Sequence, residues 1–123
     1  MLDWKQISEQ YPKAWERFTK WAKLFHKKQS RVSITRNGLC WKTAVGNDRG
    51  QISNRICYDF FDTEGVRIEI RVFGIEDGYD YEIYNLDGNT LESMDGYLLT
   101  RTEAEQQAFT KAFSILEERL ANA

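Results

Sequence analysis

The chain has 123 residues, 41% of them hydrophobic and 14% aromatic, with a single proline, which excludes a disordered or linker-rich protein and fits one globular domain with a real core. Two cysteines and one histidine are too few for a structural zinc site, which takes four such ligands. No segment is apolar over a membrane-spanning length and the charged N-terminus does not resemble a signal peptide, so we expect a cytoplasmic protein with reduced cysteines.

The net charge of −2 conceals an uneven distribution. Residues 1–55 contain 12 Lys or Arg and 4 Asp or Glu, whereas residues 56–123 contain 5 and 15. Such asymmetry marks either a nucleic-acid-binding half or two halves that attract each other within one fold. The isoelectric point of about 5.5 favours internal attraction, since nucleic-acid-binding domains are usually basic.

Residues 1–28 predict a helical segment in two pieces. Asp3 and Gln6 have the spacing of a capping box, and Pro12 suits the first position of a second helix. The apolar face of that helix follows steps of three and four residues and consists of Trp15, Phe18, Ala22 and Phe25.

Residues 31–85 predict an antiparallel sheet, made of a hairpin and a three-stranded meander. Asn37-Gly38 is typical of a two-residue type I′ turn, which pairs Arg36 with Leu39 and aligns Ile34 with Trp41. The following segment, AVGNDRGQISNR, is polar and glycine-bearing and predicts an exposed loop.

The stretch CYDFFDTEGVRIEIRVF, residues 57–73, predicts the first hairpin of the meander. A three-residue loop with Gly65 in the left-handed conformation places Phe60 opposite Ile68 and Asp59 opposite Glu69. The next strand, YDYEIYN, then pairs Tyr81 with Val72, which leaves one apolar and one charged face. The charged face comprises Asp59, Arg67, Glu69, Arg71, Glu82 and Tyr84.

Residues 100–121 predict a C-terminal helix, opened by a Thr100–Glu103 capping box. An alanine-rich stripe flanked by Phe109 and Phe113 suits close packing on a sheet.

Before this helix, Asp87-Gly88-Asn89 predicts ordinary turns, because Glu92 stands where a calcium-binding EF-hand needs glycine. The fold class expected is therefore α+β, a single domain over residues 1–123 with N- and C-terminal helices on one face of an antiparallel sheet.

The facing carboxylates Asp59 and Glu69 have two interpretations. An acidic residue on one strand and acidic-x-basic on the next resembles the core of PD-(D/E)xK nucleases, in which two carboxylates hold Mg²⁺ and a lysine assists the attacking water. The candidate ligands are Asp59 (or Asp62) and Glu69, with Arg71 at the lysine position, and arginine is a poor base. The alternative, which the sequence favours, is a solvated charge ladder offset by Arg67 and Arg71.

Nucleic-acid binding is a second hypothesis. The order helix, strands, helix resembles the double-stranded-RNA-binding domain, but the last helix starts TRTEAE, with two glutamates where that family has basic residues. The candidate phosphate-contacting residues lie in the basic half and are Lys20, Lys23, Lys27, Lys28, Arg31 and Arg49. Scattered surface lysines are the commoner explanation of such a set.

Enzymatic activity has little support in the sequence. His26 is the one histidine, and the chain contains no Gly-x-Ser-x-Gly elbow, Walker loop or dinucleotide fingerprint. We therefore expect no cofactor and no catalytic residues.

Three segments, YPKAWERF, CYDFFDTEGVRIEI and TRTEAEQQAFTKAFSILEERL, resemble small proteins of unknown function from bacteria, prophages and phages. The resemblance implies an intracellular accessory role and brings no activity, cofactor or site. We expect a non-enzymatic, phage- or mobile-element-related binding protein whose partner is a protein or a nucleic acid. An acidic half of this kind suits a basic protein partner.

Overall fold

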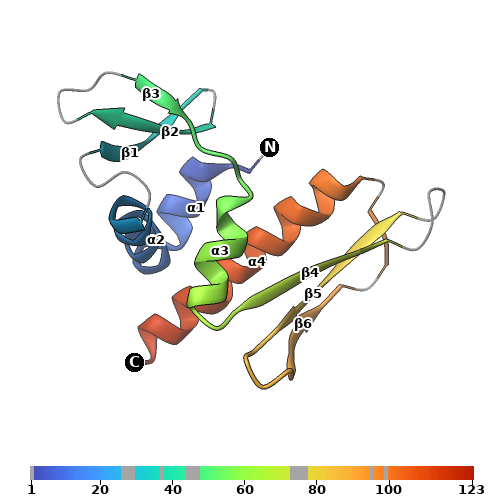
Figure 1. Cartoon of the computed structure of the whole chain (residues 1–123). Helices are drawn as coiled ribbons and strands as arrows, with labels where there is room; N and C mark the ends of the chain where they lie inside the picture. The colour runs from blue at the N-terminus through green and yellow to red at the C-terminus, as the bar shows by residue number, and fades with distance from the viewer. Residues whose placement is uncertain are drawn as a thin grey trace.

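The computed structural model describes residues 2–25, 30–36, 38–43, 48–72, 78–94, 96–98 and 100–123. The helices of this part are α1 (Trp4–Gln10), α2 (Pro12–Phe25), α3 (Ile56–Thr63) and α4 (Arg101–Ala121). The strands are β1 (Ser30–Thr35), β2 (Gly38–Thr43), β3 (Asp48–Gln51), β4 (Arg67–Val72), β5 (Tyr79–Tyr84) and β6 (Thr90–Ser93). They form two three-stranded antiparallel sheets, ordered β1-β2-β3 and β4-β5-β6 (Figure 1).

The two N-terminal helices are confirmed. The Asp3 side chain accepts a 3.0 Å hydrogen bond from the backbone N–H of Gln6, and Pro12 is the first residue of α2. Of the predicted apolar face of α2, Phe18 and Ala22 are completely buried and Trp15 is partly buried against the core, while the side chain of Phe25 lies outside the described residues.

The first sheet keeps the predicted faces but not the predicted register. Leu39 pairs with Ile34 rather than with Arg36, and Trp41 pairs with Val32. A displacement of two residues leaves every side chain on its predicted face, because side chains alternate with period two. The predicted loop after this hairpin is wrong over residues 48–51, which form β3 against β2.

The strand predicted over residues 57–62 is wrong, because Ile56–Thr63 is helix α3. Cys57, Phe60 and Phe61 are buried, which is the three-and-four spacing of a helical face. Gly65 has the predicted left-handed conformation, with φ 74°, but it ends a helix instead of turning a hairpin. The Val66 N–H donates to the Phe61 carbonyl at 2.8 Å and the Gly65 N–H to the Asp62 carbonyl, a Schellman motif.

The second sheet is therefore β4-β5-β6. Ile70 pairs with Tyr81 and Arg71 with Asp80, again two residues from the predicted register and on the predicted faces. The turn predicted at Asp87-Gly88-Asn89 is confirmed, since the Asn85 side chain accepts from the N–H groups of Asp87 and Asn89.

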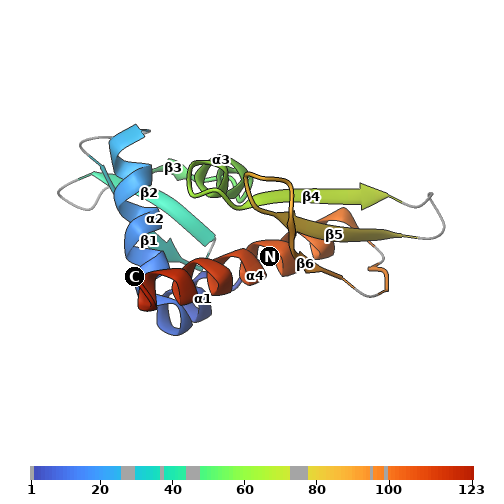
Figure 2. The same cartoon turned by 90° about the horizontal axis from the view of Figure 1, so that it is seen from below.

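Helix α4 connects the two halves of the molecule. It lies along one face of the β4-β5-β6 sheet and continues to α2, as Figures 1 and 2 show. The predicted capping box is present, with the Thr100 hydroxyl accepting from the Glu103 N–H at 3.1 Å. An aromatic cluster fills the space between α2, α3 and α4. The ring centroid of Phe18 lies 5.1 Å from that of Phe60 and 5.7 Å from that of Phe113.

Two contacts join the basic N-terminal half to the acidic C-terminal half. The Glu117 carboxylate of α4 accepts from the backbone N–H groups of Lys13 and Ala14 at 2.7 and 3.1 Å, and so caps α2 from a distant element. Arg17 of α2 donates to Glu64 at 2.7 Å.

The α+β class is thus confirmed, with two sheets in place of one. The region 31–85 expected to be sheet contains α3, and β6 extends the second sheet to Ser93. None of the helices in the described ranges has the length and apolar character required to cross a membrane.

Candidate functional site

The side of the β4-β5-β6 sheet that points away from α4 is called the outer face here. Alternation along the strands fixes its membership, because Ile68, Tyr81 and Ile83 point inward and their neighbours outward. The outer face consists of Arg67, Glu69 and Arg71 from β4, Asp80, Glu82 and Tyr84 from β5, and Thr90 from β6.

Asp80 and Arg71 form the centre of the outer face. Asp80 is only 4% exposed, and its two carboxylate oxygens accept from Nε and Nη2 of Arg71 at 2.9 and 2.8 Å. The hydrogen bonds to Asp80 raise the pKa of Arg71 above its usual range. This bidentate geometry fixes both side chains, which a single exposed ion pair does not.

Glu82 extends the network along β5. Its carboxylate accepts from Nη1 of Arg71 at 3.2 Å, from the Tyr84 hydroxyl, and from the Thr90 hydroxyl at 3.1 Å. The hydrogen bond from Tyr84 is the main cause that lowers the pKa of Glu82. The same bond raises the pKa of Tyr84 to about 12, with further contributions from burial and from the charge of Glu69.

Glu69 is exposed and pairs directly with Glu82 across the ladder. Like charges in this position destabilise a sheet. Arg71 offsets the charge of Glu82, but across the described ranges no ion pair joins Glu69 to a cation. Glu69 is therefore a carboxylate of the outer face without an ion-pair partner among the described residues.

A hollow of about 460 Å³ adjoins this carboxylate at the end of the sheet. Arg67, Glu69 and Tyr84 line it on the strand side, and Leu86 lines it from the turn. Leu86 is 71% exposed, the most exposed large hydrophobic side chain in the described part of the chain. The fixed polar network of the outer face thus borders a hollow in which the side chain of Leu86 is accessible.

The predicted pairing of Asp59 with Glu69 is wrong. Asp59 lies exposed on α3, and the partner of Glu69 is Glu82. The hypothesis of a metal site at Asp59 and Glu69 loses its geometric basis, and within the described ranges no group of three or more His, Cys, Asp or Glu side chains is arranged to hold a metal ion. The other predicted members of the charged face do share one face.

Asp80 was missed by the sequence argument, although it is the most buried charged residue of the face. The signal was present in YDYEIY, where Asp80, Glu82 and Tyr84 alternate with apolar residues. What the pattern does not reveal is burial, because an aspartate on a half-exposed strand is normally solvated.

Among the predicted phosphate-contacting residues, those whose side chains the structure describes lie on two elements, α2 and β1. Lys20 and Lys23 are exposed on α2, where Lys20 forms a 2.9 Å ion pair with Glu16. Arg31 is exposed on β1, which contacts α2, and pairs with Lys42 of β2. Lys27, Lys28 and the side chain of Arg49 lie outside the described residues.

Cysteine chemistry has no support from the geometry of Cys57. This residue is completely buried, and burial raises the pKa of its thiol well above the usual range. A nucleophilic thiolate is correspondingly disfavoured.

No protein-family model, curated protein or solved structure matches this chain.

Proposed function

We propose that the chain is a small non-enzymatic binding protein, of the accessory kind that phages and mobile elements encode, and that its outer face engages a basic segment of a partner protein. The observation that carries the proposal is the fixed network of Arg71, Asp80, Glu82 and Tyr84, which borders Glu69, a carboxylate with no ion pair among the described residues.

Preorganisation supports binding by this face. Side chains that are already held by hydrogen bonds lose little conformational entropy when a partner docks, so more of the contact energy appears as affinity. Arg71 and Tyr84 belong to the residue types that dominate binding energy at protein interfaces.

Charge complementarity favours a basic partner. A lysine or arginine placed between Glu69 and Glu82 would relieve their repulsion, which no described cation does at Glu69. Leu86 offers an apolar contact beside that position. A partner segment with a cation next to an aliphatic side chain satisfies both groups.

The test is affinity capture from a bacterial lysate, with and without nuclease treatment, using matched charge-reversal variants. Glu69→Lys changes the outer face, and Lys23→Glu makes a change of the same size on α2. We expect the same captured protein with wild type and Lys23→Glu, and its loss with Glu69→Lys. Capture that survives Glu69→Lys, or that requires nucleic acid, contradicts the proposal.

A second candidate is nucleic-acid binding by α2 and β1. It is favoured by the register that opposes Arg31 to Lys42, next to the helix that carries Lys20 and Lys23. Affinity for DNA or RNA would then fall steeply with salt, since each phosphate contact releases counterions, and Arg31→Glu would weaken it. Mobility-shift titrations at low salt that show no complex remove this candidate.

A further inference from the structure

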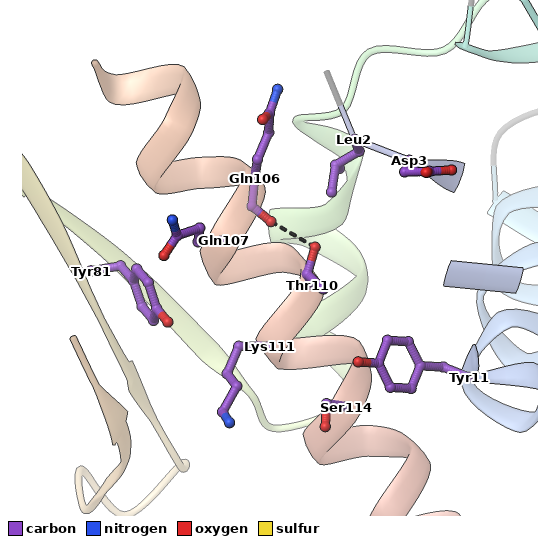
Figure 3. A pocket seen from close by; sticks show the side chains of 9 residues that line it. All are labelled: Leu2, Asp3, Tyr11, Tyr81, Gln106, Gln107, Thr110, Lys111 and Ser114. Atoms are coloured by element: carbon purple, nitrogen blue, oxygen red, sulfur yellow. Dashed lines mark hydrogen bonds between the residues drawn. The ribbon is translucent and has the colours of Figure 1, made fainter. Parts of the chain in front are cut away.

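We propose that a cavity on the inner side of the second sheet binds a neutral saccharide. The cavity, of about 360 Å³, lies beside α4, opposite in direction to the outer face. Figure 3 shows Tyr81 of β5 and Tyr11 approaching α4 from opposite sides, with their hydroxyl groups directed toward the helix. Its volume is at the lower end of small-molecule sites, which fits a ligand of monosaccharide size.

The hydroxyl of Tyr81 is the first observation for a ligand. Tyr81 is only 7% exposed, and its hydroxyl forms no hydrogen bond among the described residues, but the hydroxyl oxygen itself is accessible at the cavity. A ligand that enters the cavity can therefore pair with this hydroxyl without displacing a hydrogen bond within the described protein. Burial, followed by the nearby charge of Glu92, raises the pKa of Tyr81, so the group is a neutral donor and acceptor at physiological pH.

The helix supplies neutral polar groups at the same cavity. Gln107, Thr110 and Ser114 follow one another at steps of three and four residues, so they share one side of α4. The Thr110 hydroxyl donates to the Gln106 carbonyl at 2.8 Å and keeps its lone pairs free to accept. Amide and hydroxyl side chains offer both donors and acceptors, as the hydroxyls of a sugar require.

The charged groups at this cavity are already balanced. Nζ of Lys111 lies 3.8 Å from a carboxylate oxygen of Glu92, and Asp3 accepts the capping hydrogen bond from Gln6. An anionic ligand such as a phosphate would therefore meet no uncompensated cation here. These contacts favour a neutral, hydroxyl-rich ligand over an ionic one.

The experiment is an amide-resolved NMR titration of the whole chain with glucose, galactose, mannose and N-acetylglucosamine at millimolar concentrations. We expect at least one sugar to give saturable shifts at Tyr81 and over Gln106–Ser114. Removing one ligand hydrogen bond with Tyr81→Phe should weaken that binding by about three- to tenfold. Gln107→Ala, a change at an exposed position with no risk to folding, should weaken it as well.

Tyr97→Phe is the matched control, since it removes a hydroxyl from an exposed tyrosine that does not line the cavity, and it should leave sugar binding unchanged. The proposal is overturned if none of the four sugars gives a saturable shift, or if the shifts map elsewhere. It is overturned equally if Tyr81→Phe and Gln107→Ala bind like wild type, or if adenosine or uridine binds there and no sugar does.

Discussion

Arg71 holds the outer face together, since its guanidinium reaches both Asp80 and Glu82. Arg71→Ala leaves the carboxylate of Asp80 buried and without its bidentate partner. Because Arg71 itself is partly exposed, we expect a loss of about 1–3 kcal/mol in unfolding free energy, below the full cost of breaking a buried pair. Denaturant unfolding measures it, with Arg67→Ala as an exposed control that should change stability little. Equal midpoints for Arg71→Ala and wild type would show that the network contributes nothing.

Glu82 makes the stability of the protein depend on acidity. Its pKa is lowered from the usual 4.5, first by the hydrogen bond from Tyr84, so its contribution is complete above pH 4.5 and is lost as pH falls through the lowered pKa. Glu82→Gln removes this titration. Its unfolding free energy should therefore decline less steeply than that of wild type as the solution is acidified below pH 4.5. Parallel pH profiles for the two proteins would contradict the assignment.

At the scale of elements, α3 shows where local sequence signals are ambiguous. The residues Ile56, Tyr58 and Phe60 alternate as in a strand, whereas Cys57, Phe60 and Phe61 recur as in a helix. A left-handed glycine likewise closes a three-residue hairpin loop or ends a helix. Tertiary packing decides, because the helix places the ring of Phe61 4.9 Å from that of Phe113.

The helix starts and the strand faces were predicted correctly from local sequence signals. Both capping boxes and Pro12 mark their helix starts correctly, and strand alternation gave the correct faces in both sheets. Both registers were two residues off, because a shift of two residues keeps every side chain on its face and alternation alone does not distinguish the two registers. The Glu117 cap was not predictable, because it joins residues more than a hundred positions apart.

That cap is testable by itself. Glu117→Ala removes the acceptor of two N–H groups in the first turn of α2, and such losses typically cost about 0.5–2 kcal/mol. The matched control is Glu118→Ala, at the neighbouring exposed position of α4. Thermal or denaturant unfolding should separate the two variants. Equal stability would show that solvent replaces the cap at no cost.

The packing of α4 makes a larger contribution. Phe109 and Phe113 are 1% and 0% exposed, and each lies on the predicted apolar stripe. Replacing either by alanine should cost about 3–5 kcal/mol, as large-to-small core changes do. Midpoints of chemical denaturation like that of wild type would mean that this face does not carry the core.

At the scale of the whole molecule, the unequal charge of the two halves is partly internal. Arg17 of the basic half pairs with Glu64 of the acidic half, and Glu117 caps the basic helix α2. These contacts use the carboxylates of Glu64, directly after α3, and of Glu117 in α4, and leave those of the outer face available. The charge asymmetry therefore serves both the packing of the two halves and, as proposed, recognition of a basic partner.

The most direct test of that recognition is hydrogen exchange of the chain with and without the captured partner protein. The account predicts slower exchange of the backbone amides in Arg67–Val72, Tyr79–Tyr84 and Thr90–Ser93, with α2 and β1 unchanged. Protection confined to α2 and β1, with the second sheet unaffected, would contradict it and place the interface on the basic surface.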